Sequence, residues 1–364
     1  MSHSASRSKK RGRLFLAQFA RCGLVIAPLA YLLSPAILRA QTTPSNTWYV
    51  TIVLPPKVVA GKPATLAVLG ADGRLAPNVT VTVGKDQTVK TDATGRAFVA
   101  VPATPGVLFA EASGATKVVL VDSSVSQGAG ATGHALTIAP VISLKDSFSV
   151  CGGDFRGDAD ANHVTINDDR VLVVAASPEC VVALPSPRAI PGPARVTVDS
   201  GGPQQVATTT LVSLQFEAPR PAPLPGQKSV LTVHVEGSDA PLDITVNNET
   251  PGVVEFLKGD AEEVRTSGGS RNIAEVEIQA VRSGDYSFNA KMVQTPDTSA
   301  AELYLRAAVP LAPKALQHRV DAAANRLATH PKDRDKVKLD LTKMIATTIA
   351  GRFRVLLEAA RDAI

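Results

Sequence analysis

The residues of this chain that are best able to do chemistry are two cysteines, three aspartates in one loop and a few scattered histidines. Cys151 and Cys180 both follow residue 40, and an even number of cysteines favours a disulfide in an oxidising compartment. Closing the loop of about 30 residues between them would stabilise the folded state by about 3.5 kcal/mol. No Cys-x-x-Cys motif occurs. The sequence therefore predicts a structural bridge and not a redox centre.

Strand parity raises a difficulty for this bridge. If both cysteines lie on strands, Cys180 shares a face with Val182, whereas Cys151 lies on the face opposite Phe148 and Val150. A β-bulge at Gly152-Gly153 would bring the two thiols to the same side. We predict the disulfide together with that bulge.

Three aspartates, Asp154, Asp158 and Asp160, lie in the loop GGDFRGDADAN and offer oxygen ligands to calcium. The spacing lacks the bidentate Glu and the central Gly of an EF-hand loop, so a solvated turn is the better interpretation. The tripeptide Arg156-Gly157-Asp158 in this loop matches an integrin-type motif. Three-residue matches are common by chance, and we interpret this one as part of the turn.

The histidines show no spacing that suits a metal or a catalytic site. Those after residue 40 are His134, His163, His234, His318 and His330. None is paired with another His or Cys as zinc ligands are, and neither the zinc-protease helix motif nor a Gly-x-Ser-x-Gly elbow occurs. The sequence therefore predicts no catalytic residue, no metal site and no cofactor. A hydrolase with a motif-less site is an alternative, and it needs a cleft that joins His163 or His234 to carboxylates.

Short strands between turns must position these residues. Between residues 140 and 202 apolar side chains alternate in pairs: Phe148 and Val150, Val164 and Ile166, Val171 and Val173, Val182 and Leu184, Val196 and Val198. This pattern predicts a small antiparallel β-sandwich. Aromatic residues make up only 4% of the chain, so its cores must consist of Val, Ala and Leu.

The turns of this stretch resemble those of the IPT/TIG branch of immunoglobulin-like domains. The matching pieces are Gly-Gly-Asp-Phe after one strand, Ser-Pro before another and PGPARVTVDSGG at the close. The resemblance implies an Ig-like sandwich over residues 135–212 and brings no catalytic residues with it.

The blocks on either side have similar patterns. Residues 48–122 contain a Thr-Asp-Ala-Thr-Gly-Arg turn that feeds a strand, and they resemble bacterial Ig-like and carboxypeptidase-regulatory-type sandwiches. Residues 123–134 are rich in Ser, Gly and Ala, which predicts a flexible linker that lets the first two sandwiches reorient. Alternation restarts after the central block, and we expect a third Ig-like sandwich over 213–309.

Residues 310–364 change to a helical period and predict an αα-hairpin broken near Pro331. The longer apolar stripe consists of Leu341, Ile345, Ile349, Phe353, Leu356 and Ala360. One interpretation is that this stripe packs on the third sandwich. The other is that residues 331–364 form an oligomer or partner interface, because the stripe exceeds what a small sandwich needs covered.

Residues 1–40 have the composition of an export signal. They hold seven basic residues, no acidic residue and an apolar run over residues 23–38, and we expect cleavage after Ala40, with Ala36 as the alternative. A retained anchor is the competing interpretation, although this run is shorter than the ~20 residues that span a bilayer. No apolar run of membrane length follows it.

The charge of the remaining chain argues against nucleic acid as a partner. The net charge is +5, but without the first forty residues 31 basic side chains face 33 acidic ones. We expect a mainly β protein of three tandem Ig-like sandwiches and a helical hairpin, exported to the periplasm, the cell surface or the medium. Its expected role is that of a non-catalytic envelope scaffold that binds a protein or a surface polysaccharide. A carbohydrate-binding accessory module is an alternative, and it needs an aromatic platform from Trp48, Tyr49, Tyr286 and Tyr304.

Overall fold

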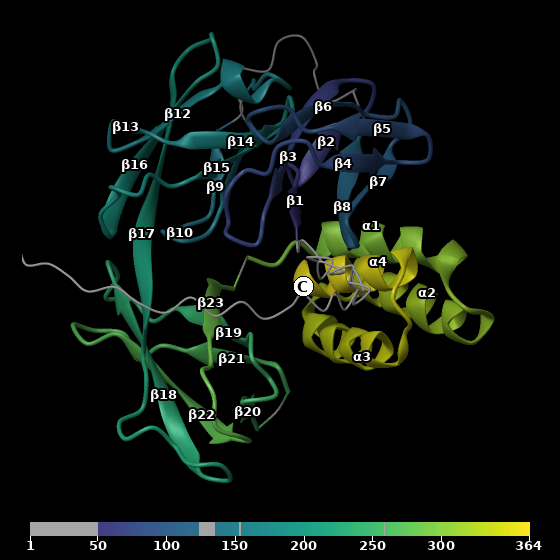
Figure 1. The fold of residues 1–364 in the computed structure, drawn as a ribbon. Coiled ribbons are helices and arrows are strands. Elements are labelled where there is room, and N and C mark those ends of the chain that lie inside the picture. The colour runs from purple at the N-terminus through teal and green to yellow at the C-terminus, as the bar shows by residue number, and fades with distance from the viewer. Residues whose placement is uncertain (1–49, 124–134, 153, 258, 294) are drawn as a thin grey trace, which may run out of the picture. The chain divides into compact units, whose positions relative to one another are not determined.

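The structure is a computed structural model that describes residues 50–123, 135–152, 154–257, 259–293 and 295–364. The predicted signal peptide, all but the first residue of the predicted linker, Trp48 and Tyr49 lie outside these ranges. Among the described residues, the strands all lie before Val293 and the four α-helices follow it (Figure 1). The protein is mainly β with a helical C-terminal part, as predicted.

The first sandwich packs two sheets around a core of Val, Leu and Ala side chains. One sheet contains β1 (Thr51–Val53), β3 (Pro63–Leu69) and β6 (Arg96–Ala100). The facing sheet has the order β2 (Lys57–Val59), β8 (Ala115–Asp122), β7 (Gly106–Ala112), β4 (Thr80–Val83) and β5 (Gln87–Lys90). Alternation determines which side chains enter the core: Val81 and Val83 of β4 are buried, while Thr80 is exposed.

The second sandwich buries the alternating residues that the sequence singles out, among them Phe148, Val164 and Val196. One of its sheets has the order β14 (Leu172–Ala176), β15 (Cys180–Leu184), β11 (Phe148–Cys151) and β9 (Thr137–Ile138). The other contains β13 (Asp169–Arg170), β12 (His163–Ile166), β16 (Gly192–Asp199) and β17 (Gln205–Glu217), with β10 (Val141–Ser143) parallel to β17.

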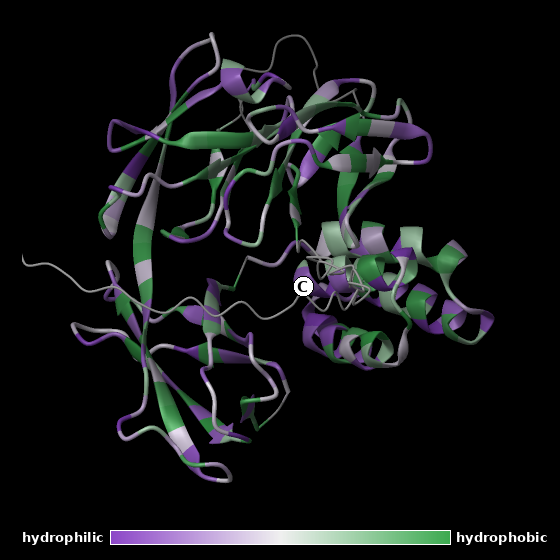
Figure 2. Cartoon of the chain, viewed as in Figure 1, coloured by the Kyte–Doolittle hydropathy of each residue, from purple (hydrophilic) through white to green (hydrophobic). Residues whose placement is uncertain are grey.

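The third sandwich shares β17 with the second. The first half of β17 pairs with β16 and the second half pairs with β18 (Lys228–Glu236) (Figure 1). The sheet continues through β22 (Ile273–Ala280) to β20 (Val254–Phe256) and faces β21 (Ala261–Arg265), β19 (Asp243–Asn248) and β23 (Phe288–Met292). Leu211 lies in the second core and Val212 in the third. The colours of Figure 2 show the accompanying alternation of apolar and polar residues along these strands.

Four helices replace the predicted hairpin. They are α1 (Thr298–Ala308), α2 (Lys314–Thr329), α3 (Arg334–Thr347) and α4 (Arg352–Asp362), with 3-10 turns η3 (Val309–Leu311) and η4 (Pro331–Asp333). The predicted long second helix is wrong because the chain breaks after Thr347 and restarts beyond Gly351, whose φ of 153° suits glycine. Helix α1 lies inside the block that we expected to be sandwich. Its sequence signal is Asp297, whose carboxylate accepts a hydrogen bond from the Ala300 amide as an N-cap.

These helices pack on the first sandwich, so the interpretation that they cover the third is wrong. Their buried residues form one cluster with Phe109, Val118 and Leu120, which lie on β7 and β8. Most of the long apolar stripe is buried in that cluster. Ile349 is the exception, at 89% exposed, because it lies in the break between α3 and α4. The helices also contact the third sandwich through the ion pair of Lys338 with Glu263, at 2.8 Å.

The first and second sandwiches are joined by contacts that are distant in sequence. Thr65 of β3 pairs with Ala176 of β14, so that one sheet contains strands of both sandwiches. The Thr65 hydroxyl donates to the Gly157 carbonyl at 2.6 Å and accepts from the Ala159 amide at 3.3 Å. A Cβ on Gly157 would lie 2.2 Å from the Pro63 carbonyl oxygen, so only glycine fits there. The expectation that these two sandwiches reorient freely is therefore wrong.

Candidate functional site

Cys151 and Cys180 lie directly opposite each other on β11 and β15 and form a disulfide, with 4.1 Å between their Cα atoms. The parity difficulty arose from assigning Val182 to the main core. Val150 and Val181 face that core, while Val182 belongs to a smaller apolar cluster shared with the first sandwich. Both cysteines therefore share the face of Val182, and no bulge between them is required. The bridge joins two neighbouring strands of one sheet.

The aspartate loop is occupied by its own hydrogen bonds. Asp158 caps the short 3-10 turn η2 (Ala159–Ala161) by accepting from the Asp160 amide, and Asp160 pairs with Arg96 of the first sandwich. Arg156 donates from Nε to the Ser200 carbonyl. Within the described ranges no group of three or more His, Cys, Asp or Glu residues could hold a metal ion. Within the RGD tripeptide, Gly157 contacts the first sandwich, whereas Arg156 and Asp158 bond within the second.

The histidines lie on separate elements. His234 pairs with Glu217 across neighbouring strands at 2.7 Å, and His163 lies 3.1 Å from the Arg170 guanidinium. Neither of the two pockets described below is lined by His163 or His234. His134 lies outside the described residues. The cleft that a motif-less hydrolase needs is not formed by either pocket.

The aromatic residues of the carbohydrate alternative are not brought together. Tyr304 is 8% exposed in the helical core, and burial together with the charge of Asp297 raises the pKa of its hydroxyl to about 12. Tyr286 contacts the ring of Phe288 edge-on in the third sandwich, with 5.6 Å between ring centres. Trp48 and Tyr49 lie outside the described ranges. No platform is formed by the two tyrosines that the structure places.

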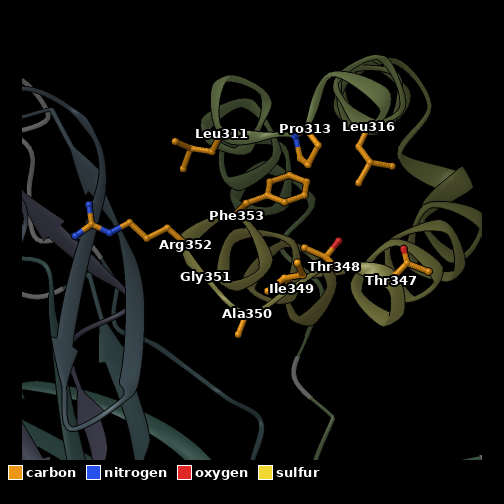
Figure 3. A pocket seen from close by; sticks show the side chains of 10 residues that line it. All are labelled: Leu311, Pro313, Leu316, Thr347, Thr348, Ile349, Ala350, Gly351, Arg352 and Phe353. Carbon is orange, nitrogen blue, oxygen red and sulfur yellow. The ribbon is translucent and has the colours of Figure 1, made fainter.

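The candidate site is an apolar pocket among the helices, with a volume of about 440 Å³ (Figure 3). One wall is made by Leu311, Pro313 and Leu316, where η3 leads into α2. The opposite wall is residues 347–353, where α3 ends and α4 begins. The interruption of the helix forms the pocket, because residues outside a regular helix leave the packed bundle.

Two large hydrophobic side chains of this pocket are exposed. Leu311 is 48% exposed and Ile349 is 89% exposed, although both are large hydrophobic residues. Phe353 lies between the two walls in Figure 3 and is buried. Apolar surface of this kind, framed by polar residues, marks interaction sites more often than it marks inert surface.

The segments that line the pocket carry basic side chains and no acidic ones. The two segments that line it, residues 309–319 and 343–354, contain five Lys or Arg residues and no Asp or Glu. Arg352 points away toward the first sandwich, where it pairs with Glu111 at 2.7 Å, and Arg354 pairs with Glu358 on its own helix (Figure 3). Lys314 and Lys343 are exposed. The site is thus an apolar pocket with a cationic rim.

Sequence reasoning placed Ile349 within a continuous stripe and so missed this pocket. A signal was available, since Thr347-Thr-Ile-Ala-Gly351 combines β-branched residues with a glycine, and both lower helix propensity.

The sequence analysis also did not identify Arg96 as a buried cation. Its burial depends on the packing of a second sandwich, which nothing near residue 96 indicates.

Comparisons with known proteins give fold similarity only. No family model matches the chain, and no curated protein gives a significant match. Among solved structures, the surface layer protein SbsC (domains 1–6) is 14% identical over 67% of this chain and 38% of its own, with a TM-score of 0.17. The N-terminal four Ig domains of Dscam1 are 10% identical over 65% of this chain and 73% of the Dscam1 chain, with a TM-score of 0.23. Invasin, a bacterial integrin-binding protein, is 17% identical over 67% of this chain and 57% of the invasin chain, with a TM-score of 0.18.

The chain thus spans less than two thirds of SbsC and of invasin. TM-scores this low leave the activities and partners of these proteins without weight for this chain. The sheets themselves define the class, which is a tandem of β-sandwiches followed by a helical domain. In the part of the chain that the structure describes, no helix is long and apolar enough to cross a membrane.

Proposed function

We propose that this protein is an exported, non-catalytic scaffold of the cell envelope or surface, and that its helical domain binds an acidic segment of a partner protein. Export rests on the first forty residues and on the disulfide, which persists in oxidising compartments. The scaffold role rests on the contacts between sandwiches, since a shared strand and a shared sheet make a connected support.

The observation that carries the binding role is the pocket of about 440 Å³ with the exposed Ile349 and, on the segments that line it, the exposed basic residues Lys314, Arg319 and Lys343. An apolar pocket captures apolar side chains, and a rim of one sign selects partners of the opposite sign. An amphipathic segment with Leu or Phe on one face and Asp or Glu beside it matches both properties. A partner of this kind also fits the non-catalytic role.

The binding role is tested with a synthetic amphipathic peptide that carries Leu and Glu, and with the same peptide in which Lys replaces Glu. We expect the Glu peptide to bind and the Lys peptide not to bind, with binding weakened by salt. Ile349→Glu should abolish binding. Ile190→Glu, at a residue of the second sandwich that is 78% exposed, is the matched control and should bind as the natural chain does.

Three results would contradict this role. Equal binding of both peptides would show that the basic residues near the pocket do not select an acidic partner. Binding to anionic vesicles, lost in the Ile349→Glu variant, would show a lipid surface as the occupant. A concentration-dependent dimer, also lost in that variant, would show that a second copy fills the pocket and that the oligomer interpretation of residues 331–364 is the better one.

Export is tested separately. Cell fractionation followed by intact-mass measurement should find a mature chain beginning near Gln41 outside the cytoplasm, and thiol labelling of the unfolded protein without reductant should find no free cysteine. A full-length cytoplasmic product with three free thiols, those of Cys22, Cys151 and Cys180, would overturn the envelope assignment and leave the pocket unaffected.

A further inference from the structure

We propose that a second cavity, at the contact between the first two sandwiches, is a binding site for a small organic carboxylate. The cavity has a volume of about 280 Å³. It is lined by Arg96 of β6, by Asp160 and Asn162 of the aspartate loop, and by residues 170–173 of the second sandwich. This inference is independent of the scaffold role and of the helical pocket.

Arg96 is a buried cation with unused donors. Its side chain is 9% exposed, and its guanidinium has five N–H groups. Nη1 donates to Asp160, and Nε is buried without an acceptor among the described residues. Burying polar N–H groups without partners is costly, so an acceptor delivered by a ligand would be bound favourably. Asp160 does not supply it, since its carboxylate accepts from Nη1.

The turn before β6 holds Arg96 in place before any ligand arrives. The Asp92 carboxylate accepts from the Thr94 hydroxyl at 2.7 Å and from the Arg96 amide at 3.2 Å, and the Thr94 hydrogen bond lowers the pKa of Asp92. Gly95 has a φ of 71°, and a Cβ there would lie 2.8 Å from the Ala76 nitrogen. The backbone at Arg96 is thus fixed, which lowers the ordering cost of binding an anion at its side chain.

Arg170 of the other sandwich also lines the cavity. Arg170 of β13 places Nη2 within 3.1 Å of the His163 ring. The charged side chains that line the cavity are therefore two arginines and one aspartate. This balance favours a ligand that carries one negative charge, and a planar carboxylate matches the fork of a guanidinium.

The remaining wall decides between an inorganic anion and an organic one. Val171, Leu172 and Val173 line it, and Leu172 is 45% exposed. Phosphate or sulfate would leave this apolar wall in contact with water. A short carbon skeleton attached to the carboxylate would cover it, as small-molecule sites commonly combine apolar walls with a few polar groups.

Such a ligand would contact both sandwiches, because Arg96 belongs to the first and Arg170 to the second. Since it binds the assembled junction, it would raise the melting temperature of the natural chain in proportion to its occupancy. The carboxylate could come from an aliphatic acid or from an acidic sugar, and the experiment separates these two sources.

The experiment is titration calorimetry and thermal melting of the full chain with butyrate, D-glucuronate and inorganic phosphate. We expect one of the two carboxylates to bind and to raise the melting temperature, and the one that binds identifies the source. Arg170→Ala should weaken binding by about tenfold or more, because a charge-assisted hydrogen bond is lost. Arg188→Ala, which removes an exposed arginine outside the cavity lining, is the matched control and should leave affinity unchanged.

Asp160→Asn sharpens the test, because it removes the carboxylate that competes for Arg96. We expect tighter binding in this variant. The proposal is overturned if neither carboxylate binds to the natural chain or to Asp160→Asn at millimolar concentration. It is also overturned if Arg170→Ala and Arg188→Ala bind equally well, or if phosphate binds more tightly than both carboxylates.

Discussion

The two junctions between sandwiches are built in different ways. The second and third sandwiches are joined by one continuous strand, in which Leu211 enters one core and the next residue, Val212, enters the other. The first and second are joined by residues far apart in sequence, such as Thr65 with Gly157 and Arg96 with Asp160. The first kind of junction fails when the backbone of the strand is disturbed. The second kind fails one side chain at a time.

The two kinds of junction should affect folding and the arrangement of the sandwiches differently. A strand shared by two cores couples their folding, because each core needs the same backbone hydrogen bonds. A junction made of contacts between distant residues, here the backbone pairing of Thr65 with Ala176 and several side-chain contacts, fixes the arrangement of two sandwiches. The contact of the helices with β7 and β8 belongs to the second kind, since the helices follow the first sandwich by about 180 residues. Four predictions test this distinction.

The largest effect is expected from Val212→Pro. Proline in the middle of β17 removes a backbone donor and restricts the strand, at a cost of about 3 kcal/mol or more. Val212 is fully buried, so the second and third sandwiches should lose protection together in hydrogen exchange, while the first sandwich keeps its own. Ala218→Pro, just beyond the strand, is the control. Loss of protection in the third sandwich alone would show that the two cores are not coupled.

A smaller effect is expected from Thr65→Val. The substitution keeps the shape but removes the hydroxyl that bonds the Gly157 carbonyl and the Ala159 amide, which costs about 1–3 kcal/mol when such groups are left buried. Small-angle scattering should show a looser arrangement, while circular dichroism shows intact strands. Thr88→Val, at an exposed position of β5, should change neither. Unfolding of the first sandwich would show that Thr65 stabilises a core and not a junction.

A third prediction concerns alkaline pH and the helical domain. Because the folded-state pKa of Tyr304 is raised to about 12 from its usual 10, the folded protein keeps this proton over a range in which the unfolded chain releases it. The stability of the helical domain should therefore fall as pH rises between these values, by about 1.4 kcal/mol per pH unit. Thermal melts should show a loss that Tyr304→Phe removes and Tyr286→Phe does not. An equal loss in both variants would place the sensitive group elsewhere.

The smallest effect is expected from Arg352→Ala. Arg352 pairs with Glu111 at 2.7 Å and lies 5.1 Å from the centre of the Phe109 ring, but its side chain is 41% exposed. Partly exposed pairs of this kind contribute less than about 1 kcal/mol. Urea unfolding should show this small change, against about 2–5 kcal/mol for Leu356→Ala in the buried cluster. Equal losses would show that the ion pair, and not the apolar contact, fixes the helices on the first sandwich.

Much of each sandwich could be predicted from the sequence. Alternation at Val81 and Val83, or at Val164 and Ile166, identifies strands because side chains on a strand point to opposite faces in turn. The same logic failed for Cys180, since strand β15 is buried on both faces and its parity did not tell which face belonged to the main core. The oxidising compartment and the even number of cysteines after residue 40 predicted the disulfide. The positions of the two cysteines on neighbouring strands were not predicted.

The helical domain shows the other limit. Period and Pro331 predicted helices after residue 310, but the end of α3 was missed, and Ile349 was placed in a buried stripe that it leaves. Residues at helical spacing share one face only within a continuous helix. After a four-residue interruption, the side chains of the next helix no longer continue that face. The candidate pocket exists because of that interruption.

The sequence by itself determined the strands, the cores that they enclose and the presence of a helical C-terminal part, because these depend on the order of apolar and polar side chains over a few residues. Only the tertiary structure decided which surfaces meet. That the helices cover Phe109, Val118 and Leu120, and that Arg96 is buried and paired with Asp160, depends on the outer faces of twisted sheets that come from distant parts of the chain. The cavity lined by Arg96 lies where two distant segments meet, and the pocket lined by Ile349 lies at a break in a helix. At both places the local order of apolar and polar residues says least about the structure.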